Sequence, residues 1–484
     1  MDKRYIAAAL CVFFVGCSRV PQPMSSTEST QMETTVQTEQ TTQTEQPVQT
    51  EPTMQTGQAS PTEPVQTSAP TQQTEATEPD QTSTPTQQTE ETLPVDAPLQ
   101  TTQGIKAIWL TQFDLSDVYG TGKSQRSEKD FTEKTRVILQ NIRDMGFDTV
   151  FLQIRPNADS MYPSAYFPMS KYVVGEYGKQ ADYDPVALLV QLARETGLSI
   201  HAWINPLRGM KEEELALVGA EYPIGQWATD EEKLGTYLVP YNGMWYLNPA
   251  YPEVRKLIAD GAREALERYG FDGLHIDDYF YPTTEESFDA RAFADMGGGR
   301  TLAEFRRQSL NALVGLLYET AHGQGAVFGV SPAGNINTVY NSHYADVYTW
   351  CSQPGYVDYL CPQVYFGLEH EKFDFASVCR TYADIISREE VVLLVGMTFG
   401  KAFSGEDPYA GTGKNEWKEH KDVLKRSLEH TGKVDKCAGV AVFCYQYFYD
   451  PLTGEPVPQT QQEKESFLPV FRDMVWSTEI GNPL

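Results

Sequence analysis

The sequence comprises 484 residues and carries a formal net charge of −28 at pH 7. A chain of this length can bury a sizeable core, and its strong negative charge argues against a nucleic acid or another polyanion as a partner. Seven cysteines are few for so long a protein and show no metal-ligand spacing, so we expect neither a structural zinc site nor a disulfide framework.

The first 17 residues have the features of a secretory signal. Lys3 and Arg4 precede an apolar run from Tyr5 to Val15, which is too short to span a membrane as a permanent helix. The sequence FVGC at its end resembles the lipobox of bacterial lipoproteins, which implies that Cys17 becomes the lipid-modified first residue of the mature chain. An ordinary signal peptide with an incidental cysteine is the alternative. We therefore expect a secreted protein that a lipid anchors at the extracytoplasmic face of a bacterial membrane, in the cell envelope.

Residues 18–103 consist mainly of Thr, Gln, Glu, Pro and Ser, with a recurring QTE. Twelve acidic residues and no Lys or Arg fall between Val20 and Gly104. Such a segment cannot bury enough apolar surface to fold. Because its fully extended length is roughly 280 Å, we expect a disordered tether between the membrane and the cell wall.

From residue 104 to residue 484 the chain repeats one unit, a short apolar run followed by a loop and an amphipathic helix. The runs are AIWLTQF, DTVFLQIRP, SIHAWINP, GLHIDDY, AVFGVSP, DYLCPQVYFG, VVLLVGMTFG and GVAVFCYQYF. Eight such units predict an α/β fold, a TIM (β/α)8 barrel with enlarged loops after its strands. A doubly wound open sheet is the competing architecture, but no GxGxxG follows the first run to support it.

Apolar residues at three- and four-residue spacing predict the helices between these runs. We place the helices at residues 128–145, 185–196, 252–269, 302–323, 373–387, 415–430 and 461–476. Between residues 331 and 358 the helix signals are weak.

The stretch FDGLHIDDYFYP, residues 271–282, is the most informative part of the chain. Side chains alternate along a strand, so His275, Asp277 and Tyr279 share one face while Asp278 lies on the other. Two adjacent acids with a histidine and several aromatics favour a functional site, because ionisable groups with perturbed pKa values gather at such sites. The alternative is an Asp that caps a following helix or pairs with an arginine.

Four other runs also end in polar or aromatic residues, mostly at alternate positions. The sets are Gln153, Arg155 and Asn157; His201, Trp203 and Asn205; Gln363 and Tyr365; and Tyr445, Gln446 and Tyr447. TIM-barrel enzymes place their active sites at this C-terminal end of the strands. Sets in matching phase therefore predict one pocket, although any single set is also compatible with a satisfied polar network in the core.

Six segments together resemble the bacterial glycosyl hydrolase-like family 10 proteins. They are WLTQFD, FLQIRPNADSMYPS, HAWINPLR, WYLNPAYPEVR, DGLHIDDYFYP and YVDYLCPQVYFG, in order along the chain. The resemblance implies a TIM-barrel glycoside hydrolase, in a group whose relatives act on peptidoglycan glycan strands stripped of their peptides. A weaker similarity to family 18 chitinases is put in doubt by His275 and Tyr279, which stand where that family's motif has an Asp and its Glu.

Glycoside hydrolysis requires a proton donor for the leaving oxygen and a carboxylate or nucleophile opposite the anomeric carbon. We expect Asp277 and Asp278 to be the catalytic residues, with Asp277 the first choice. Two acids on one strand are too close for the usual carboxyl separation of roughly 5 Å or more. The second group is therefore Asp278 turned inward by a bulge, the substrate's own acetamido group, or an acid from another loop, namely Asp114, Asp159, Glu369 or Glu406.

We expect the other polar and aromatic side chains of these runs to bind the glycan. Arg155 fits a lactyl carboxylate because its planar fork matches that group, and an internal salt bridge with Asp114 or Asp277 is an equal alternative. The remaining hydrogen-bonding residues are Asn157, His201, Asn205, His275, Tyr279 and Gln363, and the stacking residues are Trp203, Tyr281, Tyr365 and Tyr445. No cofactor is expected, and the spacing of acids and His is too generic to predict a divalent cation.

Two further hypotheses stay open. The first is a surface lipoprotein that binds glycan without cutting it, and the second is hydrolysis of another bacterial or host polysaccharide. The chain retains its acids, which favours an enzyme over a binding protein.

Overall fold

The computed structural model describes residues 104–277 and 280–476. The predicted signal peptide with its lipid-modified Cys17, the predicted tether at residues 18–103, and the two site residues Asp278 and Tyr279 lie outside the described residues. Within the part that is described, no helix is both long enough and apolar enough to cross a membrane.

Parallel strands close into an eight-stranded barrel in the order β1-β11-β10-β9-β8-β7-β3-β2. They are β1 (Ile105–Leu110), β2 (Thr149–Arg155), β3 (Ser199–Ile204), β7 (Gly273–Ile276), β8 (Val327–Val330), β9 (Tyr359–Leu360), β10 (Val392–Thr398) and β11 (Cys437–Phe443). The barrel closes because β1 pairs with both β2 and β11. Each of the eight predicted runs contributes one strand, so the TIM barrel is confirmed and the open doubly wound sheet is wrong.

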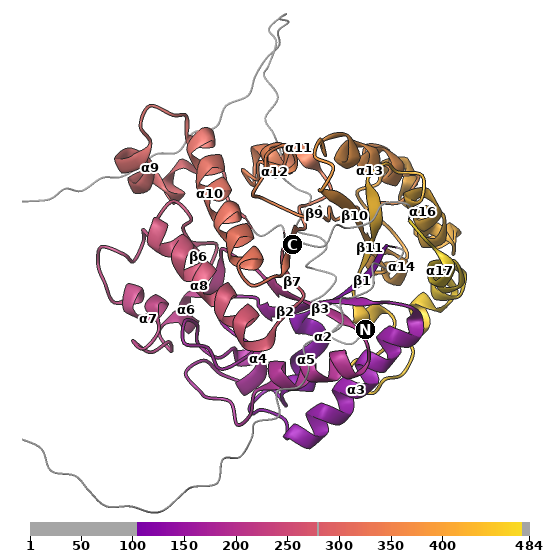
Figure 1. Ribbon diagram of the computed structural model, residues 1–484, viewed down its shortest axis with the longest axis horizontal. Coiled ribbons are helices and arrows are strands. Elements are labelled where there is room, and N and C mark those ends of the chain that lie inside the picture. The colour runs from indigo at the N-terminus through magenta and orange to yellow at the C-terminus, as the bar shows by residue number, and fades with distance from the viewer. Residues whose placement is uncertain (1–103, 278–279, 477–484) are drawn as a thin grey trace, which may run out of the picture. The chain divides into compact units, whose positions relative to one another are not determined.

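Helices surround the strands, and the chain runs round this outer layer in order (Figure 1). The larger helices are α3 (Glu128–Met145), α5 (Pro185–Glu195), α8 (Pro252–Tyr269), α10 (Leu302–His322), α13 (Phe375–Asp384), α16 (Val423–Thr431) and α17 (Gln461–Asp473). The predicted bounds of α3 and α8 are those observed. The single helix predicted at 415–430 is wrong, because extended backbone at His420 separates α15 (Glu416–Glu419) from α16.

An unpredicted helix, α2 (Gln112–Tyr119), begins directly after β1. Thr111 caps it: its hydroxyl oxygen accepts from the backbone N–H groups of Phe113 and Asp114, while the Asp114 carboxylate accepts from the backbone N–H of Thr111. This reciprocal capping box ends the strand earlier than the run AIWLTQF suggests. As a result, the backbone N–H of Gln112 lies at the C-terminal end of the barrel.

The enlarged loops after the strands contain short helices and a small antiparallel sheet. The sheet, between β3 and α8, has the order β4-β6-β5 and consists of β4 (Arg208–Lys211), β5 (Leu238–Tyr241) and β6 (Met244–Leu247). The short helices are α4 (Lys171–Val174), α6 (Glu212–Leu215), α7 (Pro223–Ala228), α9 (Ala290–Met296), α11 (Ile336–Asn341), α12 (Val347–Ser352) and α14 (Gly400–Ser404). Single 3-10 turns are η1 (Glu286–Phe288), η2 (Gly411–Gly413), η3 (Tyr445–Tyr447) and η4 (Pro458–Thr460).

Two glycines make room for large side chains inside the barrel. A Cβ atom on Gly273 would overlap the ring of His201, and a Cβ atom on Gly329 would overlap the ring of Tyr359. Both rings are buried. At these positions the barrel interior is therefore a packed core, as in other TIM barrels.

The buried carboxyl of Glu463 on α17 predicts a pH dependence of stability. It accepts a hydrogen bond from the backbone N–H of Leu424 at 2.6 Å, and burial raises its pKa to about 7. The unfolded chain releases this proton near the ordinary value of about 4.5, so the free energy of unfolding falls as the pH rises from there to about 7. Glu463→Gln keeps the acceptor and is expected to add about 1–3 kcal/mol at pH 8 and little at pH 4. Urea unfolding at both pH values tests this, and an equal change at both would contradict it.

Candidate active site

A chain of hydrogen bonds joins the ends of several elements at the C-terminal end of the barrel. The backbone N–H of Gln112 donates to Gln153 Oε1 at 2.8 Å. Gln153 Nε2 donates to Asn205 Oδ1 at 2.7 Å, and Asn205 Nδ2 donates to Asp277 Oδ2 at 2.6 Å. All four residues are buried, and Asp277 is 3% exposed. We call Gln112, Gln153, Asn205 and Asp277 the amide chain.

Strand register explains why these residues meet. β3 pairs with β7 from His201↔Gly273 to Ile204↔Ile276, so Asn205 and Asp277 follow at the same level. Because side chains alternate along a strand, Asp277 points to the same side as His275, which faces the barrel interior. The structure thus brings together Gln153, Asn205 and Asp277, one predicted residue from the end of each of β2, β3 and β7. All three lie on the side of their strands that the alternation in the sequence indicates.

Below the amide chain, buried rings form a second hydrogen-bonded series across the barrel. Trp109 Nε1 donates to His275 Nε2 at 3.2 Å, and the Tyr359 hydroxyl lies 3.0 Å from Nδ1 of both His275 and His201. Burial lowers the pKa of His201 to about 4 and that of His275 well below its ordinary value. Both imidazoles are therefore neutral near neutral pH.

The positions of the hydrogen atoms on His275, Tyr359 and His201 follow from Trp109, which is the donor at one end of this series. The Trp109 indole only donates, so neutral His275 accepts at Nε2 and carries its hydrogen on Nδ1. That hydrogen points to the Tyr359 oxygen, which leaves the Tyr359 hydroxyl hydrogen for His201 Nδ1. His201 and His275 are thus parts of an uncharged floor beneath Asp277, and the structure does not expose them to a ligand.

Aromatic rings adjoin the floor at the ends of β1, β9 and β11. Tyr365 makes an edge contact with Trp109 at 6.5 Å between ring centroids and lies 5.8 Å from the ring of Phe443. Tyr365, Phe443 and Gln363 are each partly exposed, and Gln363 Nε2 donates to the carbonyl of Ser331 at 3.3 Å. Of the predicted substrate-binding residues, Tyr365 and Gln363 therefore have surface that a ligand can reach.

Arg155 is not brought to the amide chain. The register between β2 and β3 shifts between Gln153 and Arg155, and the guanidinium turns to the outer layer, where it donates to the carbonyl of Ile258 at 3.3 Å and lies 4.4 Å from the Phe167 ring centroid. Burial lowers its pKa to about 10. This placement gives Arg155 a packing role against α8 and corrects the expectation that it binds a substrate carboxylate.

Several predicted stacking residues are buried rather than displayed. Tyr281 is 2% exposed and lies against the guanidinium of Arg306. Tyr445 is fully buried, and its hydroxyl accepts from Asn141 Nδ2 of α3 at 3.0 Å, because the chain turns into η3 after β11. Trp203 is 5% exposed inside the barrel. In this conformation none of these rings presents a face to a sugar.

The alternative partner acids fall into two groups. Asp114 and Asp159 are buried and engaged: Asp114 accepts from the backbone N–H groups of Thr111 and Gln446, while Asp159 accepts from the N–H of Asn157 and from the Tyr177 hydroxyl. Burial raises the pKa of Asp114 to about 6 and also raises that of Asp159. Glu369 and Glu406 have side chains about half exposed, next to His420 and Lys414 respectively.

Gln112 is a member of the amide chain that was not among the predicted site residues. Its backbone N–H begins the amide chain, and its side-chain oxygen lies 3.5 Å from Asn157 Nδ2, so the predicted residue Asn157 adjoins the chain. The capping pattern of Thr111 and Asp114 was the available signal, since it predicts a helix that starts at Gln112.

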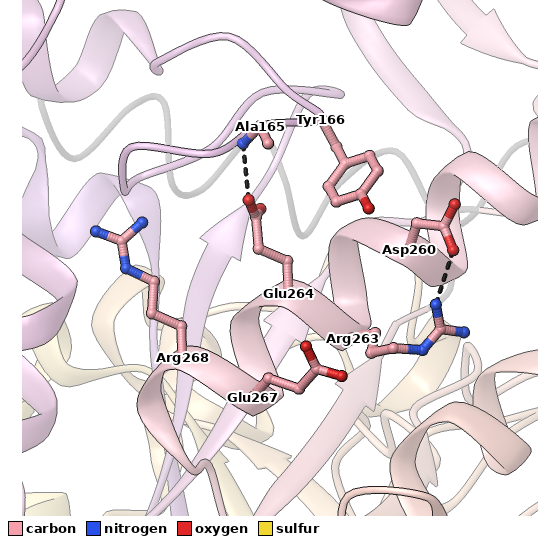
Figure 2. A pocket seen from close by; sticks show the side chains of 7 residues that line it. All are labelled: Ala165, Tyr166, Asp260, Arg263, Glu264, Glu267 and Arg268. Carbon is pink, nitrogen blue, oxygen red and sulfur yellow. Dashed lines mark hydrogen bonds and ion pairs between the residues drawn. The ribbon is translucent and has the colours of Figure 1, made fainter. Parts of the chain in front are cut away.

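Figure 2 shows a surface hollow on α8, which lies in the outer layer rather than at the strand ends. Four of its side chains already have partners. Glu264 accepts from the backbone N–H of Ala165 at 2.7 Å, Asp260 accepts from Arg263 at 2.8 Å, and Arg268 donates to Asp184 at 2.8 Å. None of the predicted site residues lines it. The lining consists of Ala165, Tyr166, Asp260, Arg263, Glu264, Glu267 and Arg268.

Among residues 104–277 and 280–476, no three His, Cys, Asp or Glu side chains lie close enough together to hold a metal ion. The cysteines that these ranges contain, from Cys351 to Cys444, are buried free thiols. The chemistry that the strand ends offer is thus that of carboxyl, amide and aromatic groups.

A closed barrel of eight parallel strands surrounded by helices defines the TIM-barrel class of proteins, whose enzymes place their active sites at the C-terminal ends of the strands. The sequence profile of the glycosyl hydrolase-like 10 family matches residues 104–407. The chain belongs to the glycosyl hydrolase-like 10 family. The family that the six sequence segments resemble is confirmed.

Relatives with similar sequences carry matching names. "Glycosyl hydrolase YngK" of Bacillus subtilis (strain 168) is 28% identical over 335 residues, which are 64% of this chain and 64% of YngK, so the match spans under two thirds of that relative. "Glycosyl hydrolase DigH" of Escherichia coli (strain K12) is 26% identical over 394 residues, 75% of this chain and 88% of DigH. A solved structure, the catalytic domain of beta-amylase from Paenibacillus polymyxa, is 10% identical with a TM-score of 0.49, over 76% of this chain and 99% of that one.

Proposed function

We propose that the protein is a cell-envelope glycoside hydrolase that cuts glycosidic bonds in peptide-free peptidoglycan strands. The observation that carries the proposal is the Asp277 carboxyl group, which directly follows the fourth barrel strand along the chain and is held there by Asn205. TIM-barrel enzymes take their catalytic residues from strand ends, and glycoside hydrolases use carboxyl groups. The glycan strand as substrate is supported by the resemblance of the six segments and by the predicted anchor and tether.

The proposed reaction divides its work between two groups. One group in its protonated form gives its proton to the leaving oxygen as the glycosidic bond breaks, and Asp277 faces the positive charge that develops at the anomeric carbon. Water then adds at that carbon, directly or after a covalent intermediate. Since Asp114 and Asp159 are buried in other hydrogen bonds, the protonated group is Asp278 or one of the partly exposed acids Glu369 and Glu406. The acetamido group of the substrate has no acidic proton to give, so its alternative role is that of the nucleophile, with Asp277 stabilising the charge that forms on it.

The proposed contacts with the sugar come from partly exposed residues of the segment that follows β9. The ring of Tyr365 offers an apolar face, and the amide of Gln363 offers a donor and an acceptor for a hydroxyl or acetamido group. Both lie on the strand-end side of the barrel floor that Trp109 and His275 form.

Mass spectrometry of the products tests the proposed function. The purified protein and its Asp277→Asn variant are incubated separately with peptide-free peptidoglycan strands. Short GlcNAc and MurNAc oligosaccharides from the unmodified protein alone are the expected result. Binding to the strands without products would replace the proposal with a glycan-binding lipoprotein, and neither binding nor products would direct the search to other polysaccharides.

The proposed lipid anchor predicts where the protein is found in a cell. Cys17→Ala is expected to abolish incorporation of radiolabelled palmitate and to move the protein from the membrane fraction, because the acyl chains supply the binding to the bilayer. Cys11→Ala is the matched control, since it changes another cysteine of the predicted signal segment and leaves the lipobox intact. Equal labelling of the Cys17 variant and the unmodified protein would contradict the anchor.

A further inference from the structure

The amide chain has a fixed direction because the group at its start can act in only one way. A backbone N–H only donates, so the Gln153 atom that faces Gln112 N must be the oxygen. The Gln153 amide nitrogen then faces Asn205, which fixes the Asn205 oxygen toward Gln153 and the Asn205 nitrogen toward Asp277. Asp277 Oδ2 is therefore an acceptor.

The opposite direction is excluded by the same groups. A proton on Asp277 Oδ2 that pointed at Asn205 would need the Asn205 oxygen in front of it, which would turn the Asn205 nitrogen toward Gln153. Gln153 would then have to turn its own nitrogen toward Gln112 N, and two N–H groups would face each other at 2.8 Å. The backbone of Gln112 thus prevents Asp277 Oδ2 from donating to Asn205. A proton on Oδ1, or on Oδ2 pointing away from Asn205, would leave the amide chain with a weaker acceptor than the carboxylate.

The start of the chain is also an electrically favourable place for a negative charge. Gln112 is the first residue of the eight-residue helix α2, where the helix dipole is positive. The capping residue Thr111 binds the N–H groups of Phe113 and Asp114, so the N–H of Gln112 is available to Gln153. Hydrogen bonds in series polarise one another, and a donor stabilises a carboxylate more than it stabilises the neutral acid.

We infer that Asp277 acts as the ionised member of the catalytic pair, and that Gln153 and Asn205 are positioning residues that hold its Oδ2 atom and favour its charge. The inference rests on the proposed glycosidase function. It assigns the proton for the leaving oxygen to a separate group, so that Asp277 is the nucleophile, the base for water or the stabiliser of charge at the anomeric carbon.

The ionisable groups near Asp277 are compatible with an ionised Asp277. On β3 and β7 the nearby imidazoles of His201 and His275 are neutral through burial, and the Tyr359 hydroxyl on β9 lies between them. Of the other ionisable groups at the strand ends, Asp114 on α2 is bound to two backbone N–H groups, Arg155 on β2 is turned to α8, and Tyr365 lies after β9 against Trp109. Asp278 lies outside the described residues. On β8, the neighbour of β7, the residues at this level are Gly329, Val330 and Ser331, which carry no charge.

The pH profile of kcat/KM on peptide-free peptidoglycan strands tests the inference. Asn205→Ala removes the donor to Asp277, and Gln153→Leu removes the bond that orients Asn205 without touching the carboxyl group. The midpoint of the acidic limb is expected to rise by about one pH unit in Asn205→Ala and by about half a unit in Gln153→Leu, because the ionised form loses its donor. A structural role alone would lower activity without moving this limb.

Asn248→Ala is the matched control. Asn248 and Asn205 are both 1% exposed, and Asn248 likewise makes two side-chain hydrogen bonds, with Thr236 O and the N–H of Ala250, but neither reaches Asp277. Its acidic limb is expected to stay in place. If Asn205→Ala does not fold, Gln153→Leu decides alone. An active unmodified protein whose variants keep the same limb would overturn the inference, whereas an inactive unmodified protein would instead overturn the proposed function.

Discussion

Asp277→Asn is expected to lower kcat/KM on peptide-free peptidoglycan strands by about 10³-fold or more. The substitution keeps the size of the side chain and an oxygen that can accept from Asn205 Nδ2, so the packing of the strand end is preserved. It removes the negative charge that the reaction needs opposite the anomeric carbon. Initial rates of oligosaccharide release, with circular dichroism to establish folding, measure the effect.

A matched control for this variant is Asp159→Asn. Asp159 is also buried, and its carboxylate is bound by the N–H of Asn157 and the Tyr177 hydroxyl rather than by the amide chain. We expect its activity to stay within about tenfold of the unmodified protein. Near-normal turnover by folded Asp277→Asn would remove Asp277 from the mechanism, and an equally large loss in Asp159→Asn would make Asp159 the missing partner.

Arg306→Met is expected to cost about 3–5 kcal/mol of unfolding free energy. Arg306 and Asp289 form an ion pair at 2.7 Å in which both side chains are fully buried. The guanidinium also donates to the carbonyls of Thr283 and Glu285 and lies between the rings of Tyr281 and Tyr344. Without Arg306, the Asp289 charge is left without its partner in the loop that follows β7. Urea unfolding at pH 7 measures the loss.

Two comparisons show whether the buried charge causes this loss. In Arg306→Met with Asp289→Asn the orphaned charge is absent, so part of the stability is expected to return. Lys129→Met breaks the exposed pair with Glu133, whose side chains are 86% and 63% exposed, and is expected to change stability by less than about 0.5 kcal/mol. Losses of similar size in Arg306→Met and Lys129→Met would contradict the account.

The barrel was predictable because its signals are local and repeated. Buried parallel strands are short apolar runs, and the outer helices show apolar residues at helical spacing, so strands and helices could be placed along the chain. Strand parity also placed Gln153, Asn205 and Asp277 in one phase before their hydrogen bonds were known. These three are the site residues that the structure joins directly.

Some site residues were placed wrongly because the alternation of side chains along a strand is interrupted within one or two residues. Strict alternation along β2 predicts that Arg155 points to the same side as Gln153. The register shift between these two residues instead turns Arg155 to the outer layer. Tyr445 follows a strand that gives way to a 3-10 turn, so its ring packs beside α3 instead of the strand ends. Burial of Tyr281 depends on Arg306, which is 25 residues further along the chain, a distance at which no local pattern reports a contact.

The hydrogen bond between Asp114 and the N–H of Gln446 indicates at which stage of synthesis the barrel can close. It joins positions 332 residues apart, beside the pairing of the first barrel strand with the last. Until the ribosome has added β11, β1 has an open edge and Asp114 lacks this donor. The candidate site at the C-terminal end of the barrel strands is therefore completed only when the final tenth of the chain emerges. A protein truncated before β11 (Cys437–Phe443) lacks both a closed barrel and this hydrogen bond.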